Sequence, residues 1–156
     1  MSNKPQEGDD APDFRMPTDG GGEVSLKDLA GKTVVLYFYP RDDTPGCTKE
    51  AIAFTGLADE FEAANAVIVG VSRDTVAKHE KFKAKHDLNV ILASDEDGEV
   101  CDSYGVWVEK NMYGRKSMGI ERSTFVIDPA GRLKKIWRKV KVAGHAEAVL
   151  ETVRGE

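Results

Sequence analysis

The feature that most constrains the fold is a buried strand that leads directly into a helix. Thr33–Tyr39 is rich in β-branched and aromatic residues, which is typical of a buried strand. Pro40 ends this run, and the turn-forming residues of 42–46 follow it. Apolar residues then return at helical spacing from Ala51 to Phe61. The stretch therefore predicts a strand–loop–helix unit with Cys47 in the first turn of the helix.

The predicted position of Cys47 favours a reactive thiolate. The first N–H groups of a helix have no partner within the helix, and together with the helix dipole they favour an anion. A thiol placed there ionises more readily than a free one, and the thiolate is the reactive form. Without a supporting motif, a lone cysteine at a helix start is more often an inert small residue. The residues around Cys47 decide between these interpretations.

Pro40, Thr44 and Cys47 have the spacing P-x-x-x-T-x-x-C, which resembles the active-site signature of the peroxiredoxins. The longer run Tyr39–Glu50 and the later segment Gly119–Phe125 resemble the bacterioferritin comigratory protein, or peroxiredoxin Q, branch of that family. The resemblance extends over nearly the whole chain. It implies a thioredoxin-like fold with an N-terminal β-hairpin extension. It also implies a thiol peroxidase that reduces hydrogen peroxide and organic hydroperoxides to water and alcohols.

The resemblance assigns roles to individual side chains. Cys47 is the nucleophile, which the peroxide converts to a sulfenic acid. Thr44 accepts a hydrogen bond from the peroxide while donating one to the thiolate, and Pro40 shields the pocket and fixes the path of the loop. Arg122 matches the arginine that completes the family's pocket, where it favours the thiolate and orients the substrate. Glu50 either holds that arginine or is a favourable acid in the first helical turn.

The rest of the chain predicts an α/β sandwich with right-handed parallel crossovers and an antiparallel edge. We expect two short strands around a glycine-rich turn in residues 11–24, and one helical turn after Ser25. The further strands are expected at Asn65–Ser72, Asn89–Ala93, Ser123–Asp128 and Leu133–Arg138. The helices are expected over residues 47–64, Val76–His86 (capped by Asp74 or Thr75), Glu99–Tyr104 and His145–Val153. The pattern of 105–120 indicates a polar, glycine-punctuated excursion.

Length and composition limit the classes of function. The 156 residues fit one domain, residues 1–156, of which 1–7 are expected to be flexible. A net charge of −5 does not favour nucleic acid, and the chain has no apolar stretch of membrane-spanning length and no export leader. We therefore expect a cytoplasmic protein without a membrane or nucleic-acid partner. Because the branch is often monomeric, we expect a monomer, with a dimer as the alternative.

Two cysteines make other redox and metal chemistries poor fits. The sequence has no Cys-x-x-Cys pair, which argues against a disulfide reductase of the thioredoxin type. It also has no Cys and His cluster with metal-ligand spacing, so we expect no metal and no cofactor. Two cysteines 54 positions apart form no disulfide framework, which favours a reducing compartment.

The position of a second cysteine bears on how Cys47 is reduced after its oxidation. Many relatives carry a second cysteine five residues after the first, where this chain has Ile52, and others carry it in the next helix, where this chain has none. Only Cys101 remains, and core packing explains its apolar position. We expect a one-cysteine mechanism in which thioredoxin, glutaredoxin or a small thiol reduces the sulfenic acid. A Cys47–Cys101 disulfide, which needs Cα atoms within about 7 Å, is the alternative.

A peroxide-sensing module on the same fold is the competing interpretation of the motif. In such a protein Cys47 is oxidised by peroxide and a partner recognises the sulfenic acid. Both interpretations use the same pocket, so the residues alone do not separate them. Repeated consumption of peroxide in the presence of a thiol reductant would distinguish the enzyme from the sensor.

Overall fold

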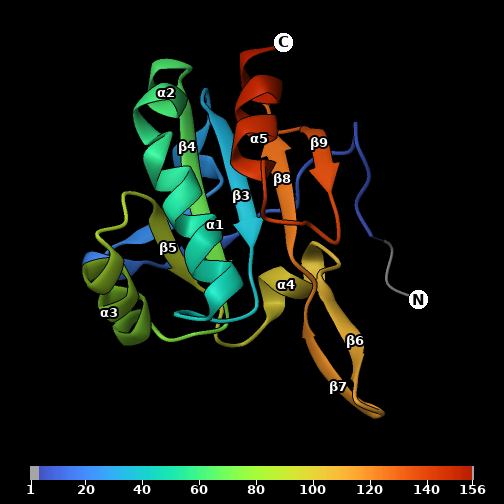
Figure 1. The fold of residues 1–156 in the computed structure, drawn as a ribbon. Coiled ribbons are helices and arrows are strands. Elements are labelled where there is room, and N and C mark those ends of the chain that lie inside the picture. The colour runs from blue at the N-terminus through green and yellow to red at the C-terminus, as the bar shows by residue number, and fades with distance from the viewer. Residues whose placement is uncertain (1–3, 156) are drawn as a thin grey trace.

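The computed structural model describes residues 4–155, which are built around one mixed sheet (Figure 1). Its strand order is β5-β4-β3-β8-β9. The strands are β3 (Thr33–Phe38), β4 (Ala66–Ser72), β5 (Ile91–Ser94), β8 (Ser123–Ile127) and β9 (Leu133–Trp137). The first three are parallel, whereas β8 is antiparallel to β3 and β9 is antiparallel to β8. The predicted α/β class with an antiparallel edge is confirmed.

Helices cover one face of this sheet, and a hairpin with one short helix covers the other. The first layer contains α1 (Pro45–Gly56), α2 (Ala58–Ala63), α3 (Val76–His86) and α5 (His145–Arg154). The second contains the antiparallel strands β1 (Arg15–Pro17) and β2 (Glu23–Ser25) and the helix α4 (Glu99–Ser103). Two short 3-10 turns, Asp19–Gly21 and Lys27–Leu29, accompany the N-terminal hairpin. The predicted strand pair near the N-terminus is therefore present.

The central strand β3 shows why the sheet is covered on both sides. Val34, Leu36 and Phe38 pack into the core beneath the N-terminal hairpin and α4. The alternate residues Val35 and Tyr37 pack into the core beneath α1, α2, α3 and α5. Because successive side chains of a strand point to opposite faces, a strand that is apolar at every position must be buried on both. Two separate hydrophobic cores result, one on each face.

The predicted helix over residues 47–64 is wrong as a single helix. Leu57 has φ −108° and ψ 7°, so it ends α1 and begins α2. Gly56 precedes it, and glycine in a helix costs more conformational entropy than other residues. Phe61 of α2 is fully buried in the same core as Phe54 of α1. The break therefore changes the direction of the chain and keeps both aromatic side chains in the core.

The segment 105–120, predicted as a polar, glycine-punctuated excursion, contains a regular hairpin that the sequence did not predict. The strands β6 (Trp107–Met112) and β7 (Arg115–Ile120) pair antiparallel and extend away from the sheet (Figure 1). The two residues between them, Tyr113 and Gly114, have φ values of 55° and 79°. Positive φ at both central residues is the geometry of a type I′ turn, whose twist matches that of paired strands. Most of β7 is exposed, so its sequence lacks the alternation of a half-buried strand.

The N-terminal segment is attached to the far edge of the sheet. The N–H of Gly8 donates to the Leu133 carbonyl (2.8 Å), and the N–H of Leu133 donates to the carbonyl of Asp9 (2.9 Å). Residues 1–3, part of the segment expected to be flexible, lie outside the described residues. Within 4–155, none of the helices combines the length and apolar character that crossing a bilayer requires.

Helix α3 begins with one of the two predicted caps. The Thr75 hydroxyl accepts a hydrogen bond from the backbone N–H of Lys78 (3.2 Å). Asp74 has a different role, because its carboxylate accepts from the backbone N–H of Asp42 (2.8 Å). A side-chain cap satisfies one of the donors that a helix start leaves free. Thr75 therefore stabilises the helix that underlies the loop after β3.

Replacing Thr75 with alanine should destabilise the protein by about 1 kcal/mol, the usual cost of losing such a cap. Chemical denaturation of the variant should give a lower midpoint with an unchanged slope. Thr75→Ser, which keeps the hydroxyl, is the matched control and should remain close to wild type. Equal stability of the alanine and serine variants would contradict the role of the hydroxyl.

Candidate active site

Cys47 lies in the first turn of α1, as predicted. Thr44 is the N-cap residue and Pro45 occupies the first helical position. Proline lacks a backbone N–H, and at this position the helix does not need one. The next two N–H groups, of Gly46 and Cys47, are among those that a helix leaves without an internal acceptor. The Cys47 side chain is turned inward and only 1 % of the residue is exposed. The thiol is therefore held in a shielded position beside unpaired backbone donors.

The pairing of β3 with β8 brings Arg122 to this thiol. Phe38, the last residue of β3, is opposite Ser123, the first residue of β8. Arg122 therefore enters β8 at the level where the chain leaves β3 for the loop to α1. Its Nη2 is 3.3 Å from Cys47 Sγ and in hydrogen-bonding geometry. A guanidinium that donates to sulfur stabilises the thiolate more than the neutral thiol.

Glu50 holds the other arm of the same guanidinium. Arg122 Nη1 donates to Glu50 Oε1 at 2.6 Å, and the Glu50 side chain is only 2 % exposed. Cys47 and Glu50 are three residues apart on α1, so they share a face of the helix. The contact supports the first of the two interpretations of Glu50, in which it holds the arginine. One planar cation thus bridges two groups on one helical turn.

Arg122 and Glu50 differ in how readily each loses its charge. Burial lowers the pKa of Arg122, but Glu50 and Cys47 outweigh burial and raise it above its usual value. Burial raises the pKa of Glu50 to about 7, an effect that Arg122 offsets only in part. The second carboxylate oxygen of Glu50 is buried without a hydrogen-bond partner among the described residues. Arg122 therefore remains charged, whereas Glu50 takes up a proton near neutral pH.

Thr44 and Pro40 lie in the loop before α1, and the Thr44 hydroxyl points differently from the prediction. The Thr44 hydroxyl donates to the carbonyl oxygen of Arg41 (2.9 Å), so its proton is used within the loop and not donated to the thiolate. Its oxygen can still accept a hydrogen bond. Pro40 is exposed.

A buried polar network that the sequence did not suggest anchors this loop to α3. The Asp42 carboxylate accepts from the Tyr39 hydroxyl (2.5 Å) and lies 2.6 Å from Nδ1 of His79, which is fully buried. His79 Nε2 donates to the carbonyl of Ala93 (2.9 Å), since a carbonyl can only accept. The spacing of the histidines along the sequence did not predict this contact. The acidic pair at 42 and 43, together with a predicted helix that carries His79 and His86, is the pattern from which it could have been predicted.

Cys101 lies on the opposite face of the sheet from Cys47. Cys47 belongs to the core beneath α1, whereas Cys101 belongs to the core beneath the N-terminal hairpin and is fully buried. Burial, with a hydrogen bond to Asp95, raises the pKa of the Cys101 thiol far above its usual value. Both cysteines are free. The two predicted partners of a disulfide are thus separated by the sheet, and the predicted core role of Cys101 fits the geometry.

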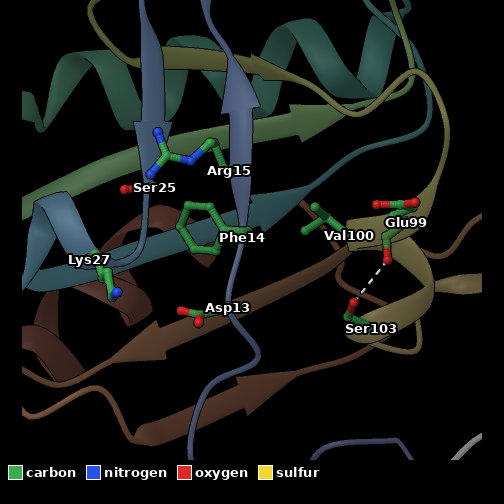
Figure 2. A pocket seen from close by; sticks show the side chains of 8 residues that line it. All are labelled: Asp13, Phe14, Arg15, Ser25, Lys27, Glu99, Val100 and Ser103. Carbon is green, nitrogen blue, oxygen red and sulfur yellow. Dashed lines mark hydrogen bonds between the residues drawn. The ribbon is translucent and has the colours of Figure 1, made fainter.

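A cavity lies away from Cys47, on the other side of the central sheet. A hollow of about 420 Å³ opens where β1 meets α4, on the face that holds Cys101 (Figure 2). Phe14 and Val100 line it together with charged side chains such as Arg15 and Glu99. None of the predicted site residues lines this hollow. Among residues 4–155, no group of three or more His, Cys, Asp or Glu side chains is placed to hold a metal ion.

Glu50→Gln should remove a pH dependence from the stability of the fold. A carboxyl with a pKa of 4.5 in the unfolded chain and about 7 in the fold stabilises fully below pH 4.5, and this contribution is lost as the pH rises through 7. The free energy of unfolding of wild type should therefore fall by roughly 2–3 kcal/mol over this window relative to the variant. Denaturation at several pH values measures it. The control Glu62→Gln, at an exposed position, should behave as wild type, and parallel curves for wild type and Glu50→Gln would disprove the assignment.

Comparison with known proteins shows the family to which the chain belongs. The profile of the AhpC/TSA family matches residues 7–136. Putative peroxiredoxin bcp of Coxiella burnetii is 51 % identical over 143 residues, which are 92 % of this chain and 95 % of the relative. Peroxiredoxin Bcp of Bacillus subtilis is 48 % identical over 147 residues, which are 94 % of each chain.

Solved structures of similar proteins share the fold. A variant of Xylella fastidiosa PrxQ has a TM-score of 0.93 at 40 % identity and covers 99 % of this chain and 98 % of its own. Xanthomonas campestris bacterioferritin comigratory protein, studied for its alkyl peroxide reduction activity, has a TM-score of 0.87 at 47 % identity, with 91 % and 90 % covered. The thioredoxin-like fold predicted from the resemblance is therefore confirmed. The chain belongs to the AhpC/TSA family and, within it, to the peroxiredoxins of the Bcp, or peroxiredoxin Q, branch.

Proposed function

We propose that this protein is a thiol peroxidase that uses Cys47 to reduce hydrogen peroxide and organic hydroperoxides. The observation that carries the proposal is the contact between Arg122 Nη2 and Cys47 Sγ, 3.3 Å, in the first turn of α1. The cation and the helix start favour the thiolate, and the shielded position favours a small substrate. The alkyl peroxide reduction described for the Xanthomonas relative supports this substrate class.

The reaction begins with attack of the Cys47 thiolate on one peroxide oxygen. A sulfur–oxygen bond forms, the O–O bond breaks, and its electron pair leaves with the second oxygen. That oxygen takes up a proton and departs as water or an alcohol, while Cys47 becomes a sulfenic acid. The Arg122 guanidinium and the free N–H groups of the first turn face the charge that moves between these atoms. Thr44 Oγ1 can accept a hydrogen bond from the peroxide.

We further propose that an external thiol regenerates Cys47. The separation of Cys47 and Cys101 by the sheet supports a one-cysteine mechanism, as does Ile52 at the position where many relatives carry a resolving cysteine. One thiol attacks the sulfenic sulfur and releases water, and a second thiol reduces the mixed disulfide. Thioredoxin, glutaredoxin or a small thiol can supply both electrons. A reducing compartment such as the cytoplasm fits two free cysteines.

Cys47→Ser should reduce thiol-dependent peroxide consumption to the background rate of buffer, because a serine hydroxyl does not ionise under these conditions. Wild type with excess dithiothreitol should consume many equivalents of peroxide, which separates an enzyme from a sensor oxidised once. The melting temperature verifies that the variant is folded. Continued turnover by a folded Cys47→Ser protein would refute the assignment of the nucleophile.

Cys101→Ser should leave repeated turnover close to wild type, since the serine keeps a hydrogen bond to Asp95 and no disulfide is needed. The same mechanism predicts the products of one equivalent of peroxide in wild type. Mass spectrometry with a dimedone-type trap should find the adduct on Cys47 and a free thiol at Cys101. A crosslinked Cys47–Cys101 peptide, or loss of turnover in a folded Cys101→Ser protein, would establish the two-cysteine alternative.

A further inference from the structure

The loop between β3 and α1 is held by contacts that converge on Asp42. The Asp42 carboxylate accepts from the Tyr39 hydroxyl (2.5 Å) and lies 2.6 Å from His79 Nδ1. The backbone N–H of Asp42 donates to the carboxylate of Asp74 (2.8 Å). The side chains of Asp42 and His79 are both buried. One residue of the loop is therefore fixed through its main chain and through both of its carboxylate oxygens.

The contact between His79 and Asp42 holds a hydrogen that neither group can spare. His79 Nε2 faces the carbonyl oxygen of Ala93 (2.9 Å), which can only accept, so Nε2 carries a hydrogen. Nδ1 faces a carboxylate oxygen, so this contact also needs one hydrogen, on either the ring or the carboxyl group. A buried polar network in which every group is paired is rigid and specifies one arrangement. The contact therefore sets where the loop lies on α3.

The next residue of the loop is also held against α3, but at the surface. Asp43 has φ 61°, a conformation that is uncommon for a residue with a side chain. Its carboxylate contacts Lys85 Nζ (2.7 Å) and His86 Nε2 (2.9 Å). Exposed ion pairs of this kind contribute little to stability. The buried contact between Asp42 and His79 is therefore the stronger of the two attachments.

The loop leads directly into the helical turn that carries the thiol. The Thr44 hydroxyl donates back to the carbonyl of Arg41 (2.9 Å), which closes residues 41–44 into a turn, and Thr44 is the N-cap residue of α1. A Cβ built at Gly46 would lie 3.1 Å from Arg122 Nη2, the atom that contacts Cys47. The start of α1 thus packs closely against the guanidinium. A displaced turn would move the thiol relative to its cation and would move Thr44 Oγ1 as well.

We propose that His79 is a positioning residue of the Cys47 site. Through its contact with Asp42 it fixes the turn that places Thr44 and the start of α1. The proposal deepens the peroxidase function proposed above and rests on it. The reaction needs the thiolate, the guanidinium and a hydrogen-bond acceptor around one peroxide, and such an arrangement is sensitive to small displacements. His79 acts on the rate by fixing these distances and takes no part in the transfer of oxygen.

The experiment compares two substitutions that each keep one of the two hydrogen bonds of His79. In His79→Asn the amide nitrogen is attached to Cγ, as Nδ1 is, so it can donate to Asp42. In His79→Gln the amide nitrogen lies one bond farther out, near the place of Nε2, so it can donate to Ala93 and not to Asp42. Both variants lose the ring and share its packing cost. Stopped-flow oxidation by hydrogen peroxide gives the second-order rate constant of Cys47, and the melting temperature gives the stability.

His79→Gln should slow oxidation by about tenfold or more, whereas His79→Asn should stay within about threefold of wild type, since a misplacement of about 1 Å can cost up to roughly a hundredfold. Asp42→Ala should slow oxidation as much as His79→Gln does, and combining the two should add no further loss because both break the same contact. Thr75→Ala is the control for stability. It weakens the same helix at its cap, and it should be oxidised at the wild-type rate.

Equal rates for folded His79→Asn and His79→Gln would overturn the role of His79 while leaving the peroxidase function intact. A Thr75→Ala protein that is as slow as His79→Gln would do the same, because the loss would then follow the stability of α3. If the variants at position 79 do not fold, Asp42→Ala tests the contact from the side of the loop, and a wild-type rate there would also overturn the role. A wild-type protein that does not react with peroxide would overturn both proposals.

Discussion

The shared guanidinium of Arg122 is the interaction on which the active site depends. It joins Glu50 and Cys47, on one face of α1, to the start of β8. The contact exists only because β8 pairs antiparallel with β3, which places residue 123 opposite residue 38 at the mouth of the loop. A shift of that register by one residue would turn every side chain of β8 to the other face. The geometry of the thiol is thus a consequence of strand pairing.

The central sheet also divides the redox chemistry of the molecule. A strand buried on both faces gives the protein two cores, and each core contains one cysteine. One thiol lies at a helix start beside a cation, whereas the other is buried against the Asp95 carboxylate. Reactivity follows from these surroundings, because thiolate formation depends on local charge and exposure. Two chemically identical residues therefore lie in very different surroundings.

The sequence predicted the elements whose pattern is dictated by burial. The apolar run of Thr33–Tyr39 and the change to helical spacing after Cys47 were enough to place the strand, the loop and Cys47 in the first turn of the helix. The β6–β7 hairpin was not predicted because it does not pack on a core. Its turn also uses Tyr113-Gly114, whereas Asn-Gly and Asp-Gly are the pairs that indicate such a turn in a sequence.

Side-chain contacts between distant segments were predicted only where the family resemblance supplied them. Arg122 was placed correctly by its motif, but the direction of the Thr44 hydroxyl and the Asp42–His79 contact depend on atomic positions in the loop. Hydrophobic periodicity carries no information about such contacts. A residue that is satisfied by a partner 37 positions away, as Asp42 is by His79, looks like any other turn residue in the sequence.

The burial of Cys47 limits how soon a reductant can reach its sulfur. With 1 % of the residue exposed, the sulfur admits a small peroxide far more readily than a bulky thiol, so in the mechanism proposed above a protein reductant must wait until the first turn of α1 opens. Opening breaks the Arg122 contacts to both Cys47 and Glu50. During that wait a second peroxide can reach the sulfenic acid and oxidise it further. In a peroxidase of this design, the number of turnovers before inactivation therefore depends on whether the helix opens faster than a second peroxide reacts with the sulfenic acid.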